Sequence, residues 1–222
     1  PHGRWRGHGA RQCNSGAKRA FLANGNLVGT SIKGNTFVGN GSTDYGIYLS
    51  GARDLVVGGS GTGELNTFAG FTYGSFYGGN LTGTTVVSNE FSNGTVGGLL
   101  VSAQSLTLGG GNTFDNYTSQ GLYVTGNNPG TTIRSNVIRG GSVMTSGIYL
   151  AAATNVSIGG PSFGQGNQIF EAVSGLTAVG DLTGTTVVGN VFSDGTRGMT
   201  FSAAKLLSAT GNTIERNSSA GL

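Results

Sequence analysis

Three charged residues have a spacing that could bring them together for chemistry. Glu171, Asp194 and Arg216 each lie four residues after one of a series of regularly spaced asparagines. If the segments around these asparagines stack, the two carboxylates lie close together and their repulsion raises the pKa of one of them. Such a pair beside a cation is the best candidate for catalysis in the chain. The alternative is a surface edge of mixed charge in which Arg216 neutralises the carboxylates.

The asparagines that define this spacing form a repeat. Each is followed two residues later by Phe or Ile, and successive members are 31, 23, 23, 24, 31, 23 and 22 residues apart. A period of this size is typical of solenoids, in which each coil is covered only by its neighbours. We call these eight residues the anchor asparagines: Asn35, Asn66, Asn89, Asn112, Asn136, Asn167, Asn190 and Asn212.

Each coil is predicted to contain three short strands joined by turns. The first strand begins at a glycine, as in residues 46–49, and the second is a run such as residues 105–108. Because side chains alternate along a strand, Ile47 and Leu49 are expected inside the coil and Tyr48 outside it.

The third strand is the anchor segment, such as residues 85–91, with Val86 and Phe91 inside. The anchor asparagine is expected at the turn, because asparagine tolerates left-handed backbone angles and its amide can bond the next asparagine in a ladder. Crossovers between parallel strands are right-handed in nearly all cases, so we expect a right-handed helix of strands.

Residues 1–19 do not fit the repeat. They contain five of the twelve basic residues, both histidines and the only cysteine. A basic arm that contacts nucleic acid is one interpretation. We instead interpret this segment as a disordered or foreign leader and expect no nucleic-acid partner.

Residues 20–222 are predicted to form the solenoid, truncated at its C-terminal end. It is built from a duplicated four-coil block of about 101 residues, the separation of Asn35 from Asn136. Residues 80–96 and 181–197 are identical at 12 of 17 positions. A single active site needs no such duplication, so the pattern favours a scaffold.

The residue types within the repeat restrict its chemistry. Residues 20–222 contain no His and no Cys, which excludes a Ser–His or Cys–His nucleophile and the usual zinc ligands. A calcium site at Glu171 and Asp194 lacks the dense acidic spacing of known calcium loops. We therefore predict no metal and no cofactor. No apolar run is long enough to span a membrane, so no membrane insertion is expected.

A second candidate site is a row of outward residues on the first strands. An exposed aromatic row can stack on sugar rings or on a partner protein, and the alternative is a cross-strand ladder that stabilises the sheet. We assign ligand binding to Tyr48, Phe76, Tyr123 and Tyr149. The whole expected row is Tyr48, Phe76, Leu100, Tyr123, Tyr149, Thr177 and Thr200.

Several motifs resemble right-handed parallel β-helix proteins of the pectate-lyase-like superfamily. They are the Asn-Thr-Phe and Asn-Thr-Ile anchors, the Gly-Ile-Tyr-Leu strand starts and the segment 158–169. The resemblance covers about residues 20–222. It implies an all-β, right-handed parallel β-helix (solenoid) of about eight to nine coils with three short strands in each. It also implies an extracellular or cell-surface location in a bacterium.

Two functions follow from this resemblance. The first is a non-enzymatic segment of a larger surface protein that acts as a scaffold, an adhesin-like module or a carbohydrate-contacting module. Its partners would be a cell-surface polysaccharide and further coils or domains of the parent chain. The second is a polysaccharide lyase, hydrolase or epimerase that acts on acidic glycans through Glu171, Asp194 and Arg216. We expect the first, because of the duplication, the low charge and the missing His and Cys.

Overall fold

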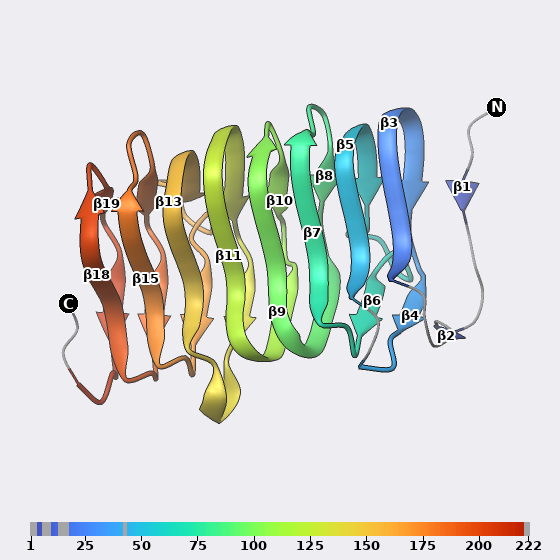
Figure 1. Cartoon of the computed structure of the whole chain (residues 1–222). Helices are drawn as coiled ribbons and strands as arrows, with labels where there is room; N and C mark the ends of the chain where they lie inside the picture. Colours follow the sequence, from blue (N-terminus) through green and yellow to red (C-terminus); the bar gives the residue numbers. More distant parts are fainter. Residues whose placement is uncertain (1–3, 6–9, 13–17, 42–43, 220–222) are drawn as a thin grey trace.

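The computed structural model describes residues 4–5, 10–12, 18–41 and 44–219. Over these residues the chain winds into about eight turns of a right-handed parallel β-solenoid with no α-helix. Figure 1 shows the coils stacked side by side, with β3 near one end of the row and β18 and β19 at the other. The predicted fold class is therefore confirmed.

The elements follow one another in a repeating order. They are β1 (Arg4–Trp5), β2 (Ala10–Gln12), β3 (Arg19–Ile32), β4 (Thr36–Val38), β5 (Tyr45–Val57), β6 (Asn66–Ala69), β7 (Tyr73–Asn80), β8 (Thr85–Val86), β9 (Asn89–Gln104), β10 (Thr107–Gly109), β11 (Thr113–Arg134), β12 (Val137–Arg139), the 3₁₀ turn η1 (Gly141–Val143), β13 (Ser146–Gly159), β14 (Gln168–Phe170), β15 (Ser174–Asp181), β16 (Thr186–Val188), β17 (Val191–Ser193), β18 (Arg197–Lys205), β19 (Ser208–Thr210) and β20 (Thr213–Glu215).

Three parallel faces run along the solenoid. Sheet A contains the strands that begin at a glycine, sheet B the second strands and sheet C the anchor segments. Each residue pairs with its equivalent in the next coil, as in Tyr48 with Phe76 on sheet A and Val57 with Val86 on sheet B. Several strands turn a corner without a break, so β5 belongs to sheets A and B and β11 contributes to all three.

The expected leader is described only in part. β1 pairs with β3, and β2 pairs with β4, both in parallel, so these five residues extend sheets B and C beyond the first full coil. The other residues before Lys18 lie outside the described ones, and the remainder of the leader prediction stays a prediction.

The interior is filled by the side chains that the alternation places inside. Ile47, Leu49, Val86 and Phe91 are fully buried, as predicted. On sheet C the rings two residues after the anchor asparagines stack from coil to coil. Phe37, Phe68, Phe91 and Phe114 have successive centroid separations of 4.9, 5.0 and 5.0 Å. Burying a phenylalanine stabilises a fold by about 1.5–3 kcal/mol, so this column is a large share of the core.

The anchor asparagines form an unbroken hydrogen-bonded ladder inside the corner between sheets B and C. Each Nδ2 donates to the Oδ1 of the next asparagine, and the seven bonds measure 2.8–3.1 Å. Most also donate to a main-chain carbonyl across the corner, as Asn112 Nδ2 does to Val86 O at 2.8 Å. The ladder thus satisfies polar groups that would otherwise be buried without partners.

The left-handed backbone at this corner is not on the anchor asparagine, and that part of the prediction is wrong. In most coils the left-handed residue is the one that precedes the anchor asparagine. Examples are Gly34, Ser88 and Ser135, with φ of 67°, 50° and 55°. The tight bend is complete before the asparagine, whose side chain then turns into the coil. An asparagine at the bend itself would carry its amide away from the ladder.

Threonines serve the corner between sheets A and B, which the sequence analysis did not identify. The buried hydroxyls of Thr84 and Thr185 donate to Ala52 O and Ala153 O at 2.7 and 2.6 Å. Both threonines and both acceptors are 101 residues apart, so the two blocks repeat the same internal bond. Thr131 makes the equivalent bond in one of the coils between them.

Breaking the ladder at its centre tests its contribution. Asn112→Ala leaves the main-chain N–H of Asn89 and the carbonyls of Val86 and Gly109 without their partner. Each buried unsatisfied group costs about 1–3 kcal/mol, so we expect the free energy of unfolding to fall by about 2–4 kcal/mol in denaturant titration. Asn93→Gly, at an exposed left-handed position, is the control and should change stability little. Equal effects of the two substitutions would contradict the role of the ladder.

Candidate functional site

The three charged candidates share one corner of the solenoid, between sheets C and A. Glu171, Asp194 and Arg216 all have left-handed backbone, with φ of 60°, 58° and 52°. Asn93 and Asn116 hold the same position in earlier coils, with φ of 60° and 57°. The corner needs this conformation in most coils, and Glu and Arg adopt it at a cost in strain that Asn and Asp largely avoid.

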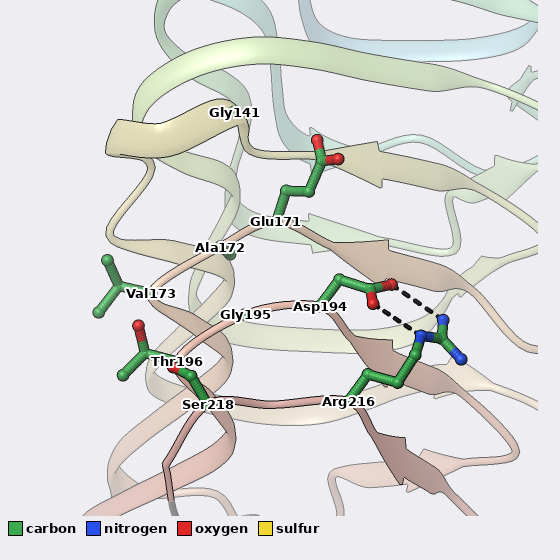
Figure 2. A pocket seen from close by; sticks show the side chains of 9 residues that line it. All are labelled: Gly141, Glu171, Ala172, Val173, Asp194, Gly195, Thr196, Arg216 and Ser218. Atoms are coloured by element: carbon green, nitrogen blue, oxygen red, sulfur yellow. Dashed lines mark hydrogen bonds and ion pairs between the residues drawn. The ribbon is translucent and has the colours of Figure 1, made fainter.

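Arg216 and Asp194 form a two-pronged ion pair across adjacent coils. Arg216 Nε donates to Asp194 Oδ1 at 2.7 Å and Nη2 donates to Oδ2 at 2.9 Å. A third donor, Nη1, bonds the carboxylate of Glu215. Figure 2 shows Glu171 extending toward the segment of Gly141, whereas Asp194 extends toward Arg216. The carboxylate of Asp194 is therefore occupied by the guanidinium.

The predicted effect of carboxylate repulsion is wrong for Asp194. The Arg216 guanidinium, assisted by the Ser193 hydroxyl, holds the pKa of the Asp194 carboxyl below its ordinary value. The same pairing raises the pKa of Arg216. The arrangement matches the alternative from the sequence, a surface edge of mixed charge that Arg216 neutralises.

These residues line a shallow, open depression of about 610 Å³ at the corner. Its lining also includes main chain and small side chains from the same corner of successive coils, among them Gly141, Gly195 and Ser218. All the charged groups therefore lie in one row on one wall. Glycoside hydrolysis needs two carboxylates on opposite sides of the bond that breaks.

The aromatic candidates do form a row on the outer face of sheet A. Tyr48 pairs with Phe76, and Tyr123 pairs with Tyr149, with one residue between the two pairs. That residue is Leu99, whereas the predicted Leu100 is fully buried. The error has a simple cause: two glycines begin this strand, and Gly97, not Gly98, aligns with the strand-start glycine of the neighbouring coils.

The first aromatic pair is packed as a ladder. The rings of Tyr48 and Phe76 are nearly parallel, with centroids 4.2 Å apart. The guanidinium carbon of Arg19, from the preceding coil, lies 4.1 Å from the centroid of Tyr48. Beside them Tyr45 stacks on Tyr73 at 5.0 Å. Both faces of the Tyr48 ring are therefore covered by the protein itself.

The second aromatic pair has a different geometry. The centroids of Tyr123 and Tyr149 are 5.2 Å apart, but their planes meet at 79°. In this edge-to-face arrangement one ring keeps both of its faces clear of its partner. Both side chains are half-buried on the outer surface. The predicted row thus contains a closed stack and an open pair.

Sequence reasoning missed the side chains that support the first pair. Arg19 was assigned to the leader, although it begins β3 and covers Tyr48. Tyr45 and Tyr73 each precede a strand-start glycine by one residue, and this repeated Tyr-Gly spacing was the available signal. The Tyr45 ring lies 5.1 Å from the Tyr48 ring and 5.8 Å from the Phe76 ring, so this tyrosine joins the outer row.

The structure also bears on metal and membrane binding within its described part. No group of three or more His, Cys, Asp or Glu residues there is arranged to hold a metal ion. Among the same residues, no helix has the length and apolar character needed to cross a membrane.

Comparison with known families identifies the class of protein. The family model described as the right-handed β-helix region matches residues 20–180, and the chain belongs to that family. A comparison with curated protein sequences found no match.

Solved structures that are similar to this chain have low sequence identity to it. Two crystal structures of the periplasmic alginate epimerase AlgG are 20% identical, with TM-scores of 0.61 and 0.60; each match covers 79% of this chain and 38% of the epimerase. A GH87 α-1,3-glucanase catalytic unit from Streptomyces thermodiastaticus strain HF3-3 is 17% identical, with a TM-score of 0.48, 84% of this chain and 46% of the glucanase. The chain therefore spans less than half the length of these enzymes.

Replacing Arg216 tests the electrostatics of the corner. Because the pKa of Asp194 is lowered in the folded state, the pair stabilises the fold above the ordinary pKa of the carboxyl. That stabilisation disappears as pH falls through the lowered value. Arg216→Gln should therefore raise the pKa of Asp194 toward its ordinary value, as measured by carboxyl NMR titration. Arg53→Gln, on β5 near the other end of the solenoid, should leave it unchanged. An unaltered Asp194 pKa in Arg216→Gln would refute the pairing.

Proposed function

We propose that the chain is a non-enzymatic, glycan-contacting segment of a larger protein that acts outside the cytoplasm, at the cell surface or in the extracellular space. The observation that carries this proposal is the row of half-buried aromatic side chains along the outer face of sheet A. Aromatic rings beside neutral polar groups are the usual surfaces on which proteins bind sugars. The parallel stacking of coils gives this face the elongated form that suits a polymer.

The charged corner supports binding or structure better than catalysis. A general acid must hold a proton near the working pH, whereas pairing with Arg216 keeps Asp194 ionised. The corner is also exposed, with Arg216 and Asp194 side chains 59% and 40% accessible. Water therefore screens the charges that an active site would need to concentrate.

A second candidate function is lyase, hydrolase or epimerase activity on acidic glycans. One observation favours it: Glu171 is held in strained left-handed backbone at the open depression that Arg216 also lines. Strain of this kind occurs at functional sites. In that case Glu171 would exchange the proton and Arg216 would pair with the uronate carboxylate. The named activity of the alginate epimerase with the same fold is consistent with such a substrate.

The two functions predict different results in an activity assay and a binding assay. With alginate, pectin or glycosaminoglycans we expect no unsaturated uronides in ultraviolet absorbance, which would report a lyase. We also expect no new reducing ends, which would report a hydrolase, and no change in uronate composition, which would report an epimerase. We also expect the protein to migrate more slowly in native gels in which a polysaccharide is embedded than in gels without it. Glu171→Gln and Asp194→Asn should not alter that retardation. Any of these three activities, if both substitutions abolish it, would replace the first function by the second.

A further inference from the structure

We propose that the glycan site on sheet A is the Tyr123–Tyr149 pair and that it takes a neutral glycan rather than a polyuronate. This inference rests on the proposed function and narrows it in two ways, to one pair of rings and to one class of sugar. It divides the four aromatic residues of the row into a structural ladder and a binding site.

The division follows from which ring faces are available. A pyranose ring binds an aromatic side chain by placing its apolar C–H face on the ring. Arg19 and Phe76 already occupy the two faces of Tyr48 at 4.1 and 4.2 Å. Tyr123 and Tyr149 meet edge to face at 79°, so one of these rings has neither face stacked on its aromatic partner, and both side chains are partly exposed. Their neighbours along the row are Leu99 and Thr177, neither of which brings another ring.

The class of sugar follows from charge. In the six successive coils that contain β5, β7, β9, β11, β13 and β15, no outward residue of sheet A between Tyr45 and Val179 is charged. The cations at the two ends of this face are Arg19 and Arg197. Ser146, on the strand of Tyr149, pairs with Ser174, and Ser174 pairs with Arg197. Arg197 therefore lies two coil spacings, or about 10 Å, from Ser146.

A uronate carboxylate placed on the tyrosine pair would lose water without gaining a cation. Burying an ionised carboxylate without a partner is strongly unfavourable. The carboxylates and arginine of the corner between sheets C and A do not help, because Arg216 is already shared by Asp194 and Glu215. The absence of an available cation at the pair therefore selects against acidic chains.

The polar groups around the pair are those that suit sugar hydroxyls. The Ser146 and Thr177 hydroxyls are 2.8 Å apart across adjacent coils, and Thr177 is half-buried on the surface. Gln120 and Thr125 lie on the same strand as Tyr123 and are also half-buried. These side chains donate and accept neutral hydrogen bonds. The 3₁₀ turn η1 projects at the corner that leads into β13, the strand that carries Tyr149 (Figure 1).

The experiment compares neutral and acidic hexasaccharides on the whole chain. Cellohexaose, xylohexaose and mannohexaose are the neutral probes, and hexagalacturonate and hexamannuronate are the acidic ones. Binding is measured by isothermal titration calorimetry and by chemical-shift changes. The site variants are Tyr123→Ala and Tyr149→Ala, and the matched controls are Tyr48→Ala and Phe76→Ala. Circular dichroism and thermal unfolding establish that every variant is folded.

We expect at least one neutral hexasaccharide to bind, no measurable binding of the acidic ones, and a loss of at least tenfold in affinity in each site variant. The controls should keep the affinity within about twofold while lowering the unfolding temperature more than the site variants do. Stronger binding of an acidic hexasaccharide would overturn the sugar class. Affinity lost in the controls but kept in the site variants would overturn the location. Binding of none of the five probes would instead refute the proposed function on which the inference rests.

Discussion

The ladder of amide hydrogen bonds requires that the anchor asparagine of every coil lie directly beside the anchor asparagine of the preceding coil. A hydrogen bond tolerates only a few tenths of an ångström around 2.9 Å, and seven successive bonds keep within 2.8–3.1 Å. A slip of one residue in any inner coil would break two of them and turn the side chains of that coil to the opposite face. Register is therefore the constraint on which the core, the corners and the surface rows all depend.

Register converts equivalent sequence positions into continuous rows. The same rule that stacks Phe68 on Phe91 inside sheet C places Tyr48 beside Phe76 outside sheet A. It also brings Asp194 to Arg216 at the corner. Each side chain in such a row contacts the side chain at the equivalent position of the next coil. For that reason several side chains that could bind a ligand, such as Tyr48 and Asp194, are already in contact with a neighbour in their row. Only a row member whose neighbour cannot cover it is available for a ligand.

Much of this fold could be predicted from the sequence because the spacing of the repeat sets the length of each coil. The period of the anchor asparagines predicts the coils, and alternation predicts that Ile47 and Leu49 lie inside. The shared offset of four residues correctly predicts that Glu171, Asp194 and Arg216 occupy one corner row. These conclusions need only the identity and spacing of residues.

The features that could not be predicted depend on local backbone and side-chain geometry, which residue spacing does not determine. Two consecutive glycines made Leu99 and Leu100 equally plausible outward residues, and only the strand pairing distinguishes them. Spacing left neutralisation of the carboxylates by Arg216 as one of two alternatives, and it could not predict that Nε and Nη2 would both bond Asp194. The angle between the Tyr123 and Tyr149 rings is likewise a matter of packing, although it separates an open surface from a closed stack.

Cross-linking across adjacent coils tests the register most directly. Thr107 pairs with Thr132 on sheet B, about 4.8 Å apart as in any parallel pair, within the span of a disulfide. Arg134 lies two residues further on, beyond that span from Thr107. In a chain whose only cysteine, Cys13, is replaced by serine, Thr107→Cys with Thr132→Cys should oxidise readily to an intramolecular disulfide, and Thr107→Cys with Arg134→Cys should stay reduced. Ready closure of the second pair in place of the first would contradict the in-register solenoid.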